Sequence, residues 1–173
     1  VMVNCGPDCV LPRPFSVHQV INKEDLALYF AVLEGGKGTD WLAKRHKGDT
    51  VNLFGPLGNG FSVHSTSHNL LLVAGGMGTA SLYFLAEETL KKGKSVTLLY
   101  GTAVKNWYVE GLSTSGIKLI IATEDGTVGY HGLVTDILPD YVDWADQIFA
   151  CGPLPMYKAM AQMPELQNRS VQV

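Results

Sequence analysis

The fold is decided by the stretch L-L-L-V-A-G-G-M-G-T-A, residues 70–80, in which an apolar run ends in three glycines within four positions. An apolar run without alternation is typical of a parallel strand that is covered on both faces. The glycines let the backbone turn tightly, and residues 79–92 then carry apolar side chains on one helical face. A turn of this kind is where open α/β sheets bind nucleotides, although a plain strand-to-helix turn remains the alternative. The spacing is not G-x-G-x-x-G and no Walker lysine follows, so an ATPase is not indicated.

Three later apolar runs repeat this pattern and are predicted to be parallel strands, at residues 96–100, 117–122 and 147–150. A helix is expected over 133–138 with its end at Pro139, and another from Pro153 to about Gln162. A last strand is expected to begin at Val171. Residues 66–173 are therefore predicted to form a parallel α/β domain.

Residues 1–65 have a different, β-rich texture with frequent glycine and proline. Strands are predicted at 16–21, 26–33 and 51–54, the first two joined by the polar turn 22–25. Thr39 is predicted to be the N-cap of a short helix over 40–45. The expected fold class is therefore part of a small antiparallel barrel followed by a parallel α/β domain.

Two further groups of residues follow predicted strands directly. Cys151-Gly152-Pro153 comes after the strand at 147–150, and Glu124-Asp125 comes after the strand at 117–122. Ligands of open α/β sheets bind beyond such carboxyl ends, where acidic groups can bond ribose hydroxyls and repel a 2′-phosphate. The alternatives are an inert core cysteine at 151 and an Asx-type turn at 124–126.

The upstream tetrapeptide Arg13-Pro14-Phe15-Ser16 combines a fixed cation, a rigid turn, an aromatic face and a hydroxyl. Such a set can hold a phosphate and a planar ring together. An edge strand with a surface arginine explains the same residues equally well.

Composition excludes several classes of protein. The 173 residues are 46% hydrophobic and 17% charged, which is typical of a globular chain, and the net charge of -3 argues against a nucleic-acid surface. No apolar run approaches the ~20 residues of a membrane span. Three cysteines make a poor disulfide framework, which favours a cytoplasmic location. His64 and His68 lack further ligands, so no metal site is expected.

Six motifs carry a resemblance that covers nearly the whole chain: R-P-F-S (13–16), G-K-G-T (36–39), G-P-L-G-N-G-F (55–61), G-G-M-G-T-A (75–80), A-T-E-D-G (122–126) and C-G-P (151–153). In order and spacing they resemble the ferredoxin reductase-type flavoproteins. Within that group they are most similar to the electron-transfer subunits of bacterial NAD-dependent dihydroorotate dehydrogenases. Residues 1–65 would then be the FAD-binding barrel and residues 66–173 the NAD-binding domain.

The resemblance implies a set of cofactor-binding residues. For FAD, it implies phosphate contacts from Arg13, isoalloxazine contacts from Phe15 and Ser16, a lining from Ala31, Val32 and Leu33, and a diphosphate cap from Gly38 and Thr39. Pro14 is counted with this FAD-binding set. For NAD, it implies Gly75, Gly76, Gly78, Thr79, Glu124 and Asp125, with Cys151, Gly152 and Pro153 beside the nicotinamide. Cys151 is the catalytic candidate, acting through the shape of the pocket and not as a nucleophile.

The resemblance also implies an activity. The protein would be an NAD-linked flavin oxidoreductase subunit that passes electrons between NAD(H), FAD and a 2Fe-2S cluster. Its partner would be a catalytic dihydroorotate dehydrogenase-type subunit of pyrimidine biosynthesis. The family has a further segment before the first motif and four cysteines near its C-terminus, whereas no cysteine follows Cys151 here. We therefore expect a fragment truncated at both ends, with the cluster present in the full-length protein only.

Two alternatives share these motifs. One is the electron-transfer subunit of another ferredoxin reductase-type oxidoreductase, such as a hydrogenase, a glutamate synthase-like module or a ferredoxin–NADP reductase. The other is a non-catalytic nucleotide-binding module that has kept the fold and lost the cofactor. The colour of the purified protein separates these two classes, because a bound flavin is yellow.

Overall fold

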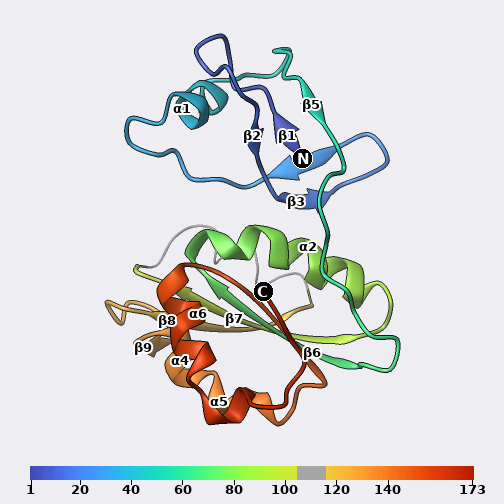
Figure 1. Ribbon diagram of the computed structural model, residues 1–173, viewed down its shortest axis with the longest axis vertical. Helices are drawn as coiled ribbons and strands as arrows, with labels where there is room; N and C mark the ends of the chain where they lie inside the picture. Colours follow the sequence, from blue (N-terminus) through green and yellow to red (C-terminus); the bar gives the residue numbers. More distant parts are fainter. Residues whose placement is uncertain (105–115) are drawn as a thin grey trace. The chain divides into compact units, whose positions relative to one another are not determined.

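The computed structural model describes residues 1–104 and 116–173, and contacts within the chain divide it into two compact units (Figure 1). We call Val1–Gly60 the front unit and Phe61–Val173 the sheet unit. No helix in the described residues is both long and apolar enough to cross a membrane.

The sheet unit is built on six parallel strands in the order β11-β10-β6-β7-β8-β9. Their bounds are β6 Asn69–Gly75, β7 Ser95–Thr102, β8 Lys118–Thr123, β9 Tyr130–His131, β10 Gln147–Cys151 and β11 Val171–Gln172. The predicted parallel strands are thereby confirmed, and β9 is an addition. Cys151 lies opposite Ala74, and Ala74 lies opposite Tyr100, so three strands end at one edge of the sheet.

Helices cover both faces of this sheet, with α2 on one face and α4, α5 and α6 on the other (Figure 1). Their bounds are α2 Thr79–Leu90, α4 Val134–Ile137, α5 Pro139–Val142 and α6 Leu154–Ala161, with the 3-10 turns η1 Gly76–Gly78 and η2 Pro164–Leu166. The predicted end at Pro139 is only half right. Proline ends α4 but also starts α5, because its missing N–H costs nothing in the first turn of a helix.

Burial explains why the strands lack alternation. Every residue of 70–74 is fully buried, because helices lie on both faces of β6. On the face of α4, α5 and α6, one hydrophobic cluster joins Leu71, Val73 and Leu99 to side chains of these helices such as Ile137 and Met156.

The segment that leads into β6 is fastened to the sheet by side chains. The amide of the fully buried Gln147 accepts a hydrogen bond from the backbone N–H of His64 at 3.0 Å. The same amide donates to the carbonyl of Ser62 at 2.8 Å. The carboxylate of Asp146 accepts from the N–H groups of His68 and Asn69 at 2.7 and 2.8 Å. Residues 62–69 therefore belong to the sheet unit.

The front unit contains two small antiparallel sheets and one helix. The first sheet has the order β2-β1-β5 and the second pairs β3 with β4. The bounds are β1 Met2–Val3, β2 Arg13–Pro14, β3 Val17–Val20, β4 Leu26–Leu28, β5 Leu53–Phe54 and α1 Lys37–Ala43. The expected class, antiparallel sheets followed by a parallel sheet, is confirmed.

Two details of the front unit differ from the prediction. The strand expected over 26–33 ends at Leu28, so residues 29–33 lie outside it. Thr39 is not the N-cap, because α1 starts at Lys37 and its N-cap residue is Gly36. The hydroxyl of Thr39 is used for a different contact, described below.

Candidate nucleotide-binding site

A cavity of about 790 Å³ lies at the carboxyl edge of the parallel strands. Its walls come from the sheet unit alone: Gly75–Gly78, Gly101–Ala103, Glu124, Gly132–Thr135, Cys151–Pro153, Pro155, Met156 and Ala159. The structure thus brings together most of the residues predicted for the nicotinamide nucleotide. Thr79 and Asp125 are not among the residues that line this cavity.

The glycines of the turn after β6 have distinct physical reasons. A Cβ on Gly78 would stand 1.8 Å from the carbonyl oxygen of Cys151, so only glycine lets the turn approach the end of β10. A Cβ on Gly75 would stand 2.6 Å from Pro153. Gly76 has a positive φ of 51°, and a Cβ there would meet nothing within 4 Å. Two of the three glycines are therefore required by packing alone, and this packing forms one wall of the cavity.

Thr79 is the first residue of α2 and is fully buried. Its hydroxyl has no hydrogen-bond partner among the residues that the structure describes. Because Thr79 follows Gly78 directly, it lies behind the cavity wall and not on it.

The two acidic residues after β8 have different surroundings. The carboxylate of Asp125 accepts hydrogen bonds from the N–H and the hydroxyl of Thr127, at 3.0 and 2.7 Å. These two bonds hold the pKa of Asp125 below its usual range. Asp125 therefore forms the Asx-type turn that the sequence left open, and Gly126 follows it with a positive φ of 71°. Glu124 is exposed and lines the cavity.

Cys151 is a free, half-buried cysteine at the last position of β10, as its place in the sequence predicted. The residue that sequence reasoning missed is Tyr157 of α6. The N–H of Gly152 donates to the Tyr157 hydroxyl at 2.9 Å. The Cys151 side chain lies near this hydroxyl and contributes to the raised pKa of Tyr157, of which burial is the largest cause. No sequence motif predicts this contact, because a single tyrosine on a helix is most simply interpreted as a packing residue.

The front unit brings together two of the segments predicted for the flavin. The Cγ of Arg13 lies 3.6 Å from where a Cβ on Gly38 would stand, so β2 contacts the first turn of α1 there. The guanidinium of Arg13 is exposed and forms no ion pair with a carboxylate in the described part of the chain. Pro14 and Ser16 are exposed beside it. Phe15 is half-buried and packs edge-on against Phe30, with ring centroids 5.4 Å apart.

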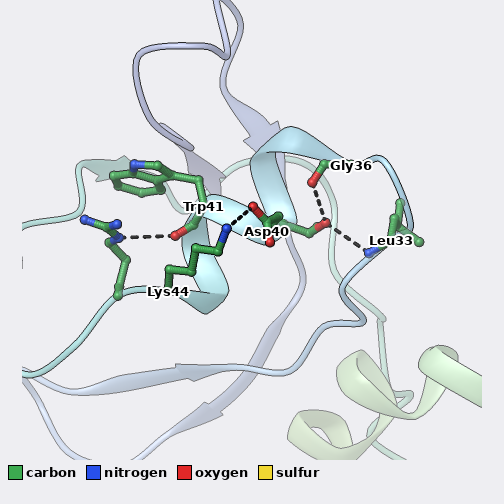
Figure 2. Close-up of polar contacts among 7 residues, drawn as sticks. Leu33, Gly36, Asp40, Trp41 and Lys44 are labelled. Carbon is green, nitrogen blue, oxygen red and sulfur yellow. Dashed lines mark hydrogen bonds and ion pairs between the residues drawn. The ribbon is translucent and has the colours of Figure 1, made fainter.

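Thr39 connects the third predicted segment to this group (Figure 2). Its hydroxyl accepts from the backbone N–H of Leu33 at 3.1 Å and donates to the carbonyl of Gly36 at 3.2 Å. The segment 31–33 is thereby held at the start of α1. Val32 and Leu33 are 54% and 62% exposed, so both present apolar surface to the surroundings.

Comparison with known proteins gives the family. No family model matches the chain. The dihydroorotate dehydrogenase B (NAD(+)) electron transfer subunit of Geobacillus sp. (strain WCH70) is 38% identical over 168 residues, which cover 94% of this chain and 64% of that protein. The protein of the same name from Caldanaerobacter subterraneus subsp. tengcongensis is 31% identical over 173 residues. That match covers 100% of this chain and 67% of the Caldanaerobacter protein.

A solved structure shows the same fold at lower identity. The ferredoxin reductase in carbazole 1,9a-dioxygenase has a TM-score of 0.79 and 21% identity, with 98% of this chain and 55% of that chain covered. This likeness supports the ferredoxin reductase-like architecture. Together with identities above 30% over essentially the whole chain, it shows that the chain belongs to the family of dihydroorotate dehydrogenase B (NAD(+)) electron transfer subunits.

Proposed function

We propose that this chain is part of an electron-transfer flavoprotein subunit, with FAD on the front unit and NAD(H) in the cavity of the sheet unit. Its partner is a catalytic dihydroorotate dehydrogenase-type subunit of pyrimidine biosynthesis. The single observation that carries the proposal is the cavity at the ends of β6, β7 and β10. The relatives of this chain are named as dihydroorotate dehydrogenase B (NAD(+)) electron transfer subunits. The chain spans about two thirds of the length of those relatives.

The cavity has the features that a dinucleotide needs. Its volume of about 790 Å³ falls in the range of small-molecule sites. The backbone of 76–78 and the start of α2 offer N–H groups and a partial positive charge to a diphosphate. Glu124 is the acidic group that can bond ribose hydroxyls, and the Cys151–Gly152 end of β10 is the proposed place of the nicotinamide.

The front unit offers a matching set for FAD. The exposed guanidinium of Arg13 can pair with a phosphate, because no ion pair among the described residues occupies it. Phe15 and the exposed apolar side chains of Val32 and Leu33 provide surface for a planar ring. Gly38 and Thr39 lie at the start of α1, where we propose that the diphosphate is capped.

When bound, nicotinamide and flavin supply two-electron and single-electron transfer. The chain's own residues bind and orient the two groups. Cys151 shapes the nicotinamide end of the cavity, and no nucleophile is required. The 2Fe-2S cluster is not assigned to residues of this chain: the described residues contain no group of three potential metal ligands.

Rapid mixing of the protein with NADH, followed at the flavin absorbance, tests this proposal. The protein should be yellow, and NADH should bleach its flavin band within the first seconds. A colourless protein that does not bind added FAD would instead be the non-catalytic module. Reduction by NADH without electron transfer to a dihydroorotate dehydrogenase-type subunit would indicate another ferredoxin reductase-type oxidoreductase.

Substitution of Cys151 tests the nicotinamide end of the site. Cys151→Ser keeps the volume, so FAD content and NAD affinity should be retained while flavin reduction slows. Cys151→Ala should slow reduction further, because it loosens the pocket. Parental rates in both Cys151 variants would make Cys151 a plain core residue.

A further inference from the structure

Tyr157 does not line the cavity itself, but it is hydrogen-bonded to Gly152, a residue of the cavity wall. It lies in the second turn of α6, half-buried, and packs against the hydrophobic cluster beneath the sheet. Its hydroxyl reaches the end of β10, where it accepts the Gly152 N–H at 2.9 Å. The Cys151 side chain lies near the same hydroxyl and contributes to the raised pKa of Tyr157. The hydroxyl thus holds the peptide between two consecutive residues of the cavity wall.

The backbone around these two residues is held tightly on its other sides. The carbonyl of Cys151 abuts Gly78, where a Cβ would stand 1.8 Å away. A Cβ on Gly152 would stand 2.6 Å from the terminal methyl of Met156 and 3.1 Å from the Cα of Gly75. Van der Waals contacts therefore limit where the Cys151–Gly152 peptide can move. The Tyr157 hydroxyl adds the polar contact that fixes its orientation.

The chemistry of the hydroxyl assigns the direction of the bond. A backbone N–H can only donate, so the tyrosine oxygen accepts from Gly152, and its own O–H is still able to donate. Burial is the largest cause that raises the pKa of Tyr157 above its usual value. The O–H therefore stays protonated, and remains a donor, across the neutral range. The Gly152 N–H, already bonded, is not free to bind a ligand.

We propose that Tyr157 is a positioning residue that fixes the Cys151–Gly152 peptide at the nicotinamide end of the cavity. The effect of this positioning on the reaction with NADH rests on the proposed function. The hydrogen bond between Tyr157 and Gly152 does not depend on the proposed function. Tyr157 acts through Cys151 and Gly152, and its hydroxyl is not offered to the ligand.

The test uses Tyr157→Phe, which removes the hydroxyl and keeps the ring that packs against the core. Tyr141→Phe is the matched control, because Tyr141 is another half-buried tyrosine against the same cluster, and its ring lies beside the Lys118 ammonium at 5.6 Å. The first measurement is hydrogen exchange of backbone amides by NMR. The Gly152 amide should exchange at least about fivefold faster in Tyr157→Phe, since one hydrogen bond is lost. The amides of 148–150 should be unchanged, as should Gly152 in Tyr141→Phe.

The second measurement is flavin reduction by NADH in rapid mixing. The limiting rate of flavin reduction should fall about fivefold in Tyr157→Phe. The NADH concentration that gives half of the limiting rate should change by less than about twofold. Unchanged Gly152 exchange would overturn the tether itself. Faster exchange with a parental reduction rate would leave the tether structural and overturn the positioning role. If NADH does not reduce the parent protein, the proposed function and the positioning role both fail, while exchange at Gly152 still reports on the tether.

Discussion

The two units of this chain are stabilised in different ways. In the sheet unit, residues 70–74 are all fully buried, and helices on both faces of the sheet add further apolar side chains. In the front unit, all of which is described, only Val3 and Cys5 are buried apolar side chains, and its strands are two to four residues long. Burial of apolar area is the main favourable term in folding. Buried apolar side chains therefore stabilise the sheet unit. The front unit buries few of them, so we expect a bound ligand to contribute a larger share of its stability.

The largest effect that we expect comes from packing in the sheet unit. Gly78→Ala should lower the free energy of unfolding by at least about 3 kcal/mol, because the new methyl group would meet the backbone of Cys151, which cannot give way. Gly60→Ala in the front unit is the control, since its Cβ would meet no atom within 4 Å. Its effect should stay within about 0.5 kcal/mol. Denaturant midpoints measure both, and equal midpoints would show that the turn after β6 is not packed as described.

The next effect concerns binding by the front unit. Arg13→Ala should weaken FAD binding by ~10–100-fold, the loss of a charge-assisted contact of roughly 1.5–3 kcal/mol. FAD should also raise the melting temperature of the parent protein more than that of the variant, because a ligand stabilises the state that binds it. Titration of the apoprotein with FAD measures the affinity. Lys47→Ala, which removes an exposed cation from the same unit, should bind FAD as the parent does. Tight binding by Arg13→Ala would remove Arg13 from the flavin site.

A smaller effect separates the two acidic residues after β8. The parent should prefer NADH to NADPH, and Glu124→Gln should reduce that preference about fivefold, since a like charge no longer faces the 2′-phosphate. Asp125→Asn should keep the preference, because the Asp125 side chain bonds Thr127. Steady-state specificity constants for both cofactors decide between the two. A parent without preference, or a change in Asp125→Asn alone, would contradict this division.

The smallest effect is a pH dependence of the sheet unit. The N–H groups of Asn69 and His68 hold the pKa of Asp146 below its usual range. A carboxyl group whose pKa is lower in the folded state stabilises that state above its unfolded pKa, and the gain is lost as pH falls through the lowered value. Asp146→Asn should therefore be less stable than the parent at pH 7, and the difference should shrink below about pH 4. Urea denaturation at both pH values checks this. A difference independent of pH would show that the charge plays no part.

The sequence predicted the sheet unit better than the front unit, and the reason is physical. Residues 70–74, 96–100 and 147–150 are buried on both faces, so their apolar runs report burial directly. Two-residue strands such as β1 and β2 have no period to detect. Thr39 has a side chain that is common at N-caps, but it lies inside the first turn of α1. Its hydroxyl bonds Leu33 and Gly36, which precede the helix.

Within the site, the glycines and Cys151 could be predicted because they stand at strand ends. The division of labour between Glu124 and Asp125 could not, because it depends on where the Thr127 hydroxyl lies. Tyr157 gave no signal, because its contact with Gly152 depends on how α6 packs against the sheet.

The buried amide of Gln147 has a practical consequence for dissecting the chain. It bonds the backbone at Ser62 and His64, and the ring of Phe61 lies edge-on to Phe149 with centroids 5.5 Å apart. Expression of the sheet unit alone should therefore begin at or before Phe61. A fragment started at β6 would leave this amide without partners in an apolar interior, at a cost of ~1–3 kcal/mol for each unsatisfied group. The eight residues before β6 look like a dispensable leader in the sequence, yet they supply backbone that the interior of the sheet unit needs.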